Sequence, residues 1–121
     1  SRIMIYGIGI DIIEISRIEK AIKRYNKKIL CRVFTPEEIK YCQGKPLPWQ
    51  HYAARFAVKE ALIKAFGKPL TLNEIGIEKH TGKAPKLKLY RNVKKKLHKK
   101  KALLSISHDH EYAIAQVILT K

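Results

Sequence analysis

The strongest periodic pattern of apolar residues runs from Ala53 to Phe66, with the sequence AARFAVKEALIKAF. At about 100° per residue, one stripe of a helix collects small and aliphatic side chains, namely Ala54, Val58, Ala61, Leu62 and Ala65. Phe56 and Ile63 project roughly opposite, so the pattern predicts a central helix that is apolar on two sides. Glu60 and Lys64 stand one turn apart, which is the spacing of an ordinary ion pair. Their small neighbours also leave room for a ligand to approach.

A second apolar segment, Ile3 to Ile13, predicts a buried strand because its alternating positions are apolar on both faces. We expect Asp11 to share a face with Ile5, Gly7 and Gly9. A buried carboxylate is costly unless it is paired or binds a metal, and the glycines leave space beside it. The alternative is an aspartate at a strand end that caps the next helix. The glycines do not form a dinucleotide-binding fingerprint, because the third glycine is missing.

Two further helices are indicated by capping residues. Ser16 followed by Glu19 predicts a capping box that opens a helix ending near Tyr25. The run Thr35–Glu38 reads as an N-cap threonine, a proline at the first helical position and a glutamate at the third. Because Gly44–Pro46 follows closely, that helix is expected to be short.

The second half of the chain has mainly strand-like patterns. Ile75–Lys79 and Lys86–Tyr90 predict two strands that are joined through Thr81–Lys83. Asn92 is the expected cap of a short helix that carries few apolar residues. Two final strands, residues 103–108 and 112–119, predict a terminal hairpin. On its first strand His108 shares a face with Leu104 and Ile106, so it is expected to point as the core residues do.

The size and charge of the chain restrict these possibilities. Its 121 residues are expected to form one domain, and no apolar run approaches the roughly 20 residues that span a bilayer. The formal net charge of +16 favours an acidic protein, nucleic acid, a phosphorylated metabolite or an anionic membrane as partner. Basic residues form a stripe on the first helix: Arg17, Lys20, Arg24 and Lys27. The lysine-rich run at 94–101 predicts a solvated face, with anion binding as the alternative.

Three features together suggest chemistry on phosphate groups. Asp11 lies at a strand end, Glu60 and Lys64 lie on the central helix, and His108 ends another strand. Two carboxylates from separate elements can hold Mg²⁺ together with phosphate oxygens, while Lys64 and His108 would supply positive charge or donors. The chain contains neither a P-loop nor a kinase signature, which argues against transfer from ATP.

These residues resemble a known family. The run G-I-G-x-D at residues 7–11, R-F-A-x-K-E-A-x-x-K-A at 55–65 and S-x-S-H at 105–108 look like the motifs of holo-[acyl-carrier-protein] synthases, the small 4′-phosphopantetheinyl transferases. The likeness covers nearly the whole chain, and it implies an α+β fold with an antiparallel-rich sheet packed around one long central helix. It further implies transfer of the phosphopantetheine arm of coenzyme A to a serine of apo acyl carrier protein. Adenosine 3′,5′-bisphosphate would be the other product, and the reaction would serve fatty acid biosynthesis.

The resemblance also assigns roles to individual residues. Asp11 and Glu60 would bind Mg²⁺, and Lys64 and His108 would contact the phosphates of coenzyme A. Glu60 and Lys64 are the expected catalytic residues. The side chains expected to dock the carrier protein are Arg17, Lys20 and Arg24. Small members of the family are trimers with active sites at subunit interfaces, so a homotrimer is expected.

Two departures from the family pattern concern the coenzyme-side loops: the chain is shortened at Gly67–Pro69 and reads Gly82-Lys83-Ala84-Pro85 before the later strand. Cys31 and Cys42 have no metal-binding spacing, so reduced thiols and a cytoplasmic location are expected. The transferase implied by the resemblance is expected to need neither nucleic acid nor a membrane as partner.

Two other hypotheses compete with the transferase. The net charge is compatible with a small nucleic-acid-binding protein, although no recognition motif is present. The run 108–111, His-Asp-His-Glu, is compatible with a zinc site, although adjacent ligands rarely close a tetrahedral site without distant partners.

Overall fold

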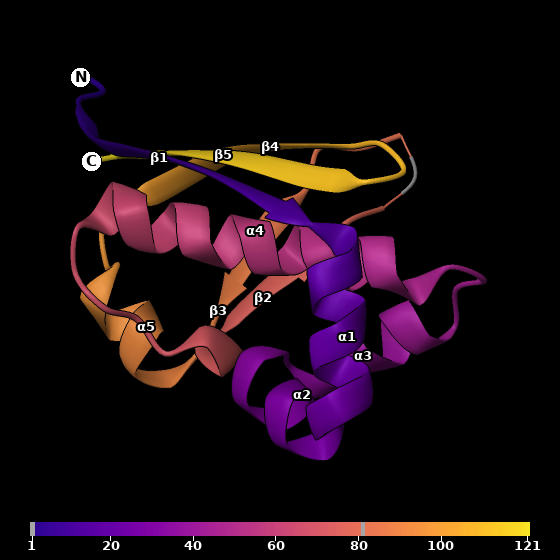
Figure 1. Ribbon diagram of the computed structural model, residues 1–121. Helices are drawn as coiled ribbons and strands as arrows, with labels where there is room; N and C mark the ends of the chain where they lie inside the picture. Colours follow the sequence, from indigo (N-terminus) through magenta and orange to yellow (C-terminus); the bar gives the residue numbers. More distant parts are fainter. Residues whose placement is uncertain (1, 81) are drawn as a thin grey trace.

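A computed structural model describes residues 2–80 and 82–121 (Figure 1). These residues form two antiparallel sheets and five α-helices. The first half of the chain consists of β1 (Ile5–Glu14), α1 (Ile15–Tyr25), α2 (Lys27–Val33), α3 (Pro36–Gln43) and α4 (Pro48–Phe66). The second half consists of η1 (Leu72–Glu74), β2 (Ile75–Glu78), β3 (Lys86–Leu89), α5 (Arg91–Lys96), β4 (Lys101–His108) and β5 (Tyr112–Thr120). The predicted α+β fold with one long central helix is therefore confirmed.

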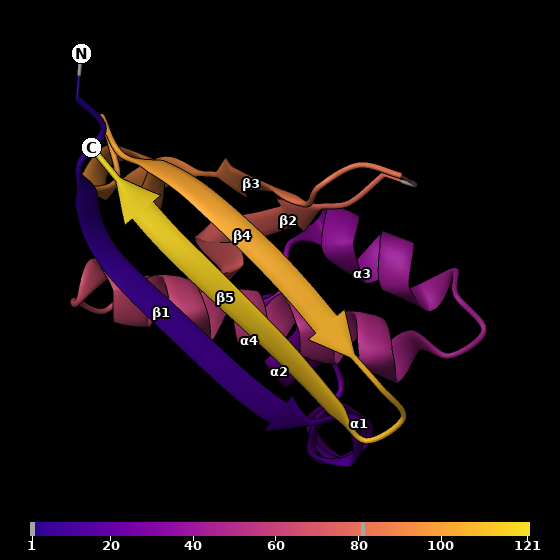
Figure 2. The ribbon, with the colours of Figure 1, turned by 90° about the horizontal axis from the view of Figure 1, so that it is seen from above.

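The fold is layered around α4. A three-stranded sheet in the order β1-β5-β4 covers one side of the helix, and Figure 2 shows its strands crossing above α4. The two-stranded sheet β2-β3 and the helices α1, α2, α3 and α5 lie on the other side of α4 (Figure 1). Because both sides are covered, α4 is buried along most of its length, with the buried residues Tyr52, Ala53, Ala54, Arg55, Ala57, Val58, Lys59, Ala61, Leu62 and Ala65. It ends at a glycine in the left-handed conformation, Gly67.

Strand β1 packs directly onto the backbone of α4 at two glycines. A Cβ atom on Gly7 would collide with the Ala65 carbonyl oxygen, and one on Gly9 would collide with the Ala61 carbonyl oxygen. Only glycine permits this close approach of strand and helix. The predicted shared face of Gly7, Gly9 and Asp11 is thus the face that meets α4, whereas Ile5 is exposed and separated from them by a register shift.

The prediction that β1 is buried on both faces is wrong for the single chain. Its helix-facing residues pack against α4, but Ile8, Ile10 and Ile12 on the outer face are 60%, 58% and 60% exposed. Strand β5 pairs with β1 throughout and contributes Ile114 and Ile118 to the same outer face. The pattern was correct about apolar character, but the outer face has no covering layer within residues 2–80 and 82–121.

The helix starts agree with the sequence in one case and differ in two. The capping box of Thr35 and Glu38 at α3 is confirmed. The capping box predicted at Ser16 is absent, and α1 begins at Ile15. The Ile15 N–H donates to the Glu111 carbonyl at 2.8 Å, so a segment distant in sequence provides an acceptor for a free N–H group of the first turn. Helix α5 begins before Asn92, and a distant carboxylate, Glu74 Oε1, accepts the Val93 N–H at 3.0 Å.

The strands of the second half were placed correctly to within two residues. In the connection of β2 to β3, Thr81 lies outside the described residues, while Gly82 has a positive φ of 74°. The terminal hairpin β4–β5 turns at Asp109, whose carboxylate accepts the N–H groups of Glu111 and Tyr112 at 2.7 Å each. No helix in the described part of the chain is long and apolar enough to cross a membrane.

Candidate active site

The first part of the candidate site is formed where β1 meets the C-terminal half of α4. Asp11 is half-buried near the end of β1, and the Lys64 ammonium lies 3.3 Å from its Oδ1 atom. The same Nζ atom donates to the Ile10 carbonyl at 2.9 Å. Glu60 lies one turn before Lys64 on α4 and is also half-buried. Three residues that the sequence singled out separately are therefore neighbours.

The electrostatics of this cluster are those of two carboxylates near one spot. The pKa of Glu60 is raised, first by burial and second by the negative charge of Asp11, and the Lys64 ammonium opposes the rise. Two neighbouring carboxylates that repel one another suit a hard cation, and Mg²⁺ is commonly held by one or two carboxylates with phosphate oxygens as further ligands. The donor set therefore fits this metal.

His108 does not join that cluster within one chain. Asp11 is opposite Ala115, Ala115 is opposite Ile106, and His108 lies two residues further along β4. The two residues thus lie two strands apart, or about 10 Å across the sheet. His108 does share the helix-facing side of β4 with Leu104 and Ile106, as predicted, but it points toward the other end of α4.

A cationic cluster that includes His108 surrounds His51 near the start of α4, and the sequence analysis did not identify it. The pKa of His51 on the first turns of α4 is lowered by burial and by the positive charges of Arg55, Lys45 and His108, which are therefore close to it. Arg55 is only 4% exposed, and its Nη1 group donates to the His51 carbonyl at 3.2 Å. Its Nε atom is buried and has no hydrogen-bond partner in the described part of the chain.

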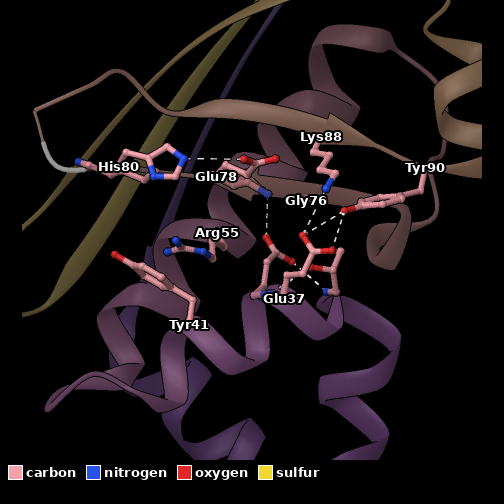
Figure 3. A pocket seen from close by; sticks show the side chains of 12 residues that line it. Glu37, Tyr41, Arg55, Gly76, Glu78, His80, Lys88 and Tyr90 are labelled. Carbon is pink, nitrogen blue, oxygen red and sulfur yellow. Dashed lines mark hydrogen bonds and ion pairs between the residues drawn. The ribbon is translucent and has the colours of Figure 1, made fainter.

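Arg55 lines a cavity of about 230 Å³ between α3 and the β2–β3 sheet (Figure 3). Its guanidinium lies over the Tyr41 ring at 4.4 Å, and no ion pair joins it to a carboxylate of residues 2–80 or 82–121. Glu37 and Lys88, by contrast, pair with each other at 3.6 Å elsewhere in the cavity. A buried cation without a paired anion is costly, so the Arg55 side of the cavity suits an anionic ligand. Burial of an arginine within an apolar helical pattern was the signal available in the sequence.

The basic residues predicted for the first helix are exposed on α1, and they border an apolar cavity. Arg17, Lys20 and Arg24 all face solvent. Lys27 belongs to α2, because Asn26 with a φ of 45° separates the two helices, so the predicted stripe ends at Arg24. The cavity beside Arg17 has a volume of about 200 Å³ and is lined mainly by α1, α2 and Phe56 of α4.

The alternative zinc site at residues 108–111 is not supported. Within the ranges 2–80 and 82–121, no group of three or more His, Cys, Asp or Glu side chains is arranged to hold a metal ion. Asp109 instead uses its carboxylate to close the turn of the hairpin.

Comparison with known proteins gives consistent relatives over nearly the whole chain. The family model of the 4′-phosphopantetheinyl transferase superfamily, ACPS, matches residues 7–117. A holo-[acyl-carrier-protein] synthase of Chlamydia caviae is 47% identical over 115 residues, which cover 92% of this chain and 93% of that protein. A holo-[acyl-carrier-protein] synthase of Geobacter sulfurreducens is 39% identical over 125 residues, which cover 98% of this chain and 99% of that protein.

Solved structures of such synthases are also similar. The enzyme of Neisseria meningitidis has a TM-score of 0.89 at 31% identity, covering 98% of this chain and 100% of that chain. The enzyme of Bacillus anthracis, crystallised in complex with CoA (3′,5′-ADP), has a TM-score of 0.82 at 35% identity, covering 98% of both chains.

Proposed function

The chain belongs to the 4′-phosphopantetheinyl transferase superfamily and within it to the holo-[acyl-carrier-protein] synthases, and on that premise we propose the reaction that it catalyses. It transfers the 4′-phosphopantetheine moiety of coenzyme A to a serine of apo acyl carrier protein, depends on Mg²⁺, and releases adenosine 3′,5′-bisphosphate. The observation that carries the proposal is the meeting of Asp11, Glu60 and Lys64 at the contact of β1 with α4. We further propose that the reaction serves fatty acid biosynthesis.

The mechanism follows from the charge of the reacting groups. The serine oxygen forms a bond to the β-phosphorus of coenzyme A, and the bond from this phosphorus to the bridging oxygen breaks. Asp11 and Glu60 would hold Mg²⁺, which would supply positive charge to the pyrophosphate oxygens. Lys64 reaches the same spot from α4 and provides a second positive charge for those oxygens. The serine proton must pass to a base, and we propose the Glu60 carboxylate for this role.

The remaining phosphate of coenzyme A requires a second cationic site. The cluster of His51, Arg55 and His108 is suited to bind it, because Arg55 is buried without a carboxylate partner in the described ranges. His108 would thus act as a coenzyme-binding residue, as expected, but together with His51 and Arg55, to which the family resemblance assigned no role. Lys64 would bind the pyrophosphate at the first site.

The carrier protein would dock on α1. Arg17, Lys20 and Arg24 present positive charge there, and acyl carrier proteins are typically acidic. The apolar cavity beside Arg17 gives this surface room for an apolar side chain of the partner. An acidic helix with an apolar anchor fits both properties.

A homotrimer would explain two features of the isolated chain. The outer face of the β1-β5-β4 sheet exposes a contiguous set of large apolar side chains, Ile8, Ile10, Ile12, Leu103 and Ile114, and such patches mark interfaces. His108 is also separated from the carboxylate pair within one chain. If neighbouring subunits meet at the sheet, the carboxylate cluster of one can face the cationic cluster of the next.

We also propose a cytoplasmic location. Cys31 and Cys42 are free thiols, and burial raises the pKa of Cys42 to about 12, so it is an inert core residue. Free thiols of this kind are usual in a reducing compartment. Acidic carrier protein and coenzyme A are the partners; neither nucleic acid nor membrane is needed for the proposed reaction.

The test is to incubate the protein with apo acyl carrier protein, coenzyme A and Mg²⁺ and to measure the intact mass of the carrier. We expect a gain of one phosphopantetheine unit, its loss with EDTA, and no gain for a carrier whose acceptor serine is replaced by alanine. No gain with several different carriers would contradict the proposal and favour another anionic partner, beginning with nucleic acid, whose binding would fall steeply with salt.

A further inference from the structure

Burial alone does not determine how α4 is rotated about its own axis. Apolar side chains occur on all sides of this helix, because it is covered by the sheet on one side and by helices and β2 on the other. The contact with β1 is made by glycine and alanine backbones, which fix how closely the two elements approach. This contact sets how deeply the strand packs against α4, and a polar contact on the opposite side of the helix can fix its rotation further. Glu60 and Lys64 face Asp11 only at one rotational setting.

The specific polar anchor of α4 is Lys59, on the side facing away from the sheet. Lys59 is 0% exposed, and its ammonium donates to three oxygens. These are the Val33 carbonyl at 2.5 Å, Glu38 Oε1 at 2.6 Å and the Leu72 carbonyl at 3.1 Å. The three acceptors belong to the end of α2, to α3 and to η1. Each of the three N–H donors of the Lys59 ammonium is therefore bound by an oxygen from a different segment of the chain.

Glu38 is itself held rigidly. Its Oε1 atom accepts the Thr35 N–H at 3.0 Å in the capping box of α3, and its Oε2 atom accepts the Ile77 N–H of β2 at 3.0 Å. The carboxylate that receives Lys59 thus cannot follow the helix if α4 turns. Rotation of α4 by one residue, about 100°, would leave both a buried ammonium and a buried carboxylate unpaired.

We propose that the buried pair of Lys59 and Glu38 is a positioning device that selects the rotational setting of α4 at which Glu60 and Lys64 face Asp11. Lys59 touches neither substrate nor metal; it acts through the helix, from the residue next to Glu60. The role assigned to Glu60 rests on the proposed function. An apolar pair would fill the same space at similar stability, because buried ion pairs contribute little net stability. The geometry therefore points to orientation as the contribution of this pair.

The test uses the double variant Lys59→Met with Glu38→Gln, which removes both buried charges and keeps side-chain volumes and a glutamine able to complete the capping box. Binding of Mn²⁺ in the presence of coenzyme A, without carrier protein, is measured by calorimetry. We expect a cooperatively folded protein whose Mn²⁺ affinity is reduced by about tenfold or more, the range for residues that orient a ligand. With carrier protein, kcat should fall while KM for the carrier stays unchanged.

The matched control is Lys23→Met with Glu19→Gln, which removes an exposed pair that is joined at 2.7 Å in α1. It should leave Mn²⁺ binding unchanged. A folded Lys59→Met/Glu38→Gln variant that binds Mn²⁺ as the wild type does would overturn the proposal. If that variant does not fold, Lys59→Gln, which retains one donor toward Glu38, serves with the same readout and the same criterion.

The wild-type result separates this inference from the proposed function. Wild-type protein that binds Mn²⁺ with coenzyme A but modifies no carrier would contradict the transferase alone. Wild-type protein that binds no Mn²⁺ would overturn the positioning inference, because Glu60 would then have no metal to be positioned for.

Discussion

At the scale of single residues, the glycines of β1 determine whether Asp11 reaches the helix. Gly9→Ala would place a methyl group against the Ala61 carbonyl oxygen, which belongs to the backbone of α4 and cannot move aside alone. We expect a loss of about 3 kcal/mol or more in the free energy of unfolding, measured by urea denaturation.

The matched control is Gly44→Ala at the end of α3. Gly44 has a φ of −79°, and the nearest atom to an added Cβ lies 3.5 Å away. The free energy of unfolding should stay unchanged or rise by up to about 1 kcal/mol. Equal effects of the two substitutions would show that the contact of β1 with α4 is not the constraint described above.

The ionisation of His51 reports on the cationic cluster. Its pKa is lowered by burial and by Arg55, Lys45 and His108, so the folded state binds the His51 proton more weakly than the unfolded state does. By linkage, His51 lowers stability as pH falls through its ordinary range near 6.5, and this effect is complete below the folded pKa. In an NMR titration we expect a His51 pKa below 6.5 that rises when adenosine 3′,5′-bisphosphate is added. An unchanged pKa at saturating ligand would argue against phosphate binding at this cluster.

The sequence predicted the cluster of Asp11, Glu60 and Lys64 better than it predicted the cationic cluster around His51. Asp11, Glu60 and Lys64 were recognisable because charged residues interrupted strongly apolar patterns, and those patterns also fixed which face each residue occupied. The sequence could not reveal that His108 lies near enough to His51 to influence its charge, since this proximity depends on how β4 crosses α4. Nor could it reveal that Arg55 is buried without a carboxylate partner in the described ranges.

At the scale of elements, docking of the carrier protein on α1 has a different consequence from attraction by the net charge of the whole chain. Replacing Arg17, Lys20 and Arg24 on α1 by glutamate should raise KM for the carrier by about tenfold and leave kcat unchanged. The control replaces Lys94, Lys95 and Lys96 on α5 by glutamate, which changes the net charge of +16 equally. We expect a much smaller change of KM in that variant. Similar KM values for both triple variants would mean that long-range attraction alone guides the carrier.

Elements were predictable from sequence where local chemistry fixed their ends. The capping box at Thr35 gave a correct helix start, because the partners of the free backbone groups are close in sequence. Helix α1 and α5 began elsewhere than predicted, since Glu111 and Glu74 from distant segments satisfy their first turns. The short helix α2 was not predicted, because its seven residues hold too few apolar positions for a recognisable period.

At the scale of the whole molecule, the apolar outer face of the sheet should hold subunits together. Ile10→Lys places a charge in the middle of that face and should convert the proposed trimer to monomers, as measured by light scattering after size-exclusion chromatography. Leu47→Lys is the control, because Leu47 is also exposed, at 64%, but lies between α3 and α4. A wild-type monomer, or a trimer that survives Ile10→Lys, would contradict assembly through this face.

The central claim is that Asp11 and Glu60 form the site at which phosphopantetheine is transferred. The most direct test measures the intact mass of apo acyl carrier protein after incubation with coenzyme A, Mg²⁺ and either Asp11→Ala or Glu60→Ala protein. We expect both variants to fold and to modify the carrier at least about a hundredfold more slowly than the wild type, while Glu111→Ala, at an exposed carboxylate, remains active. Full transfer by both folded variants would contradict the account.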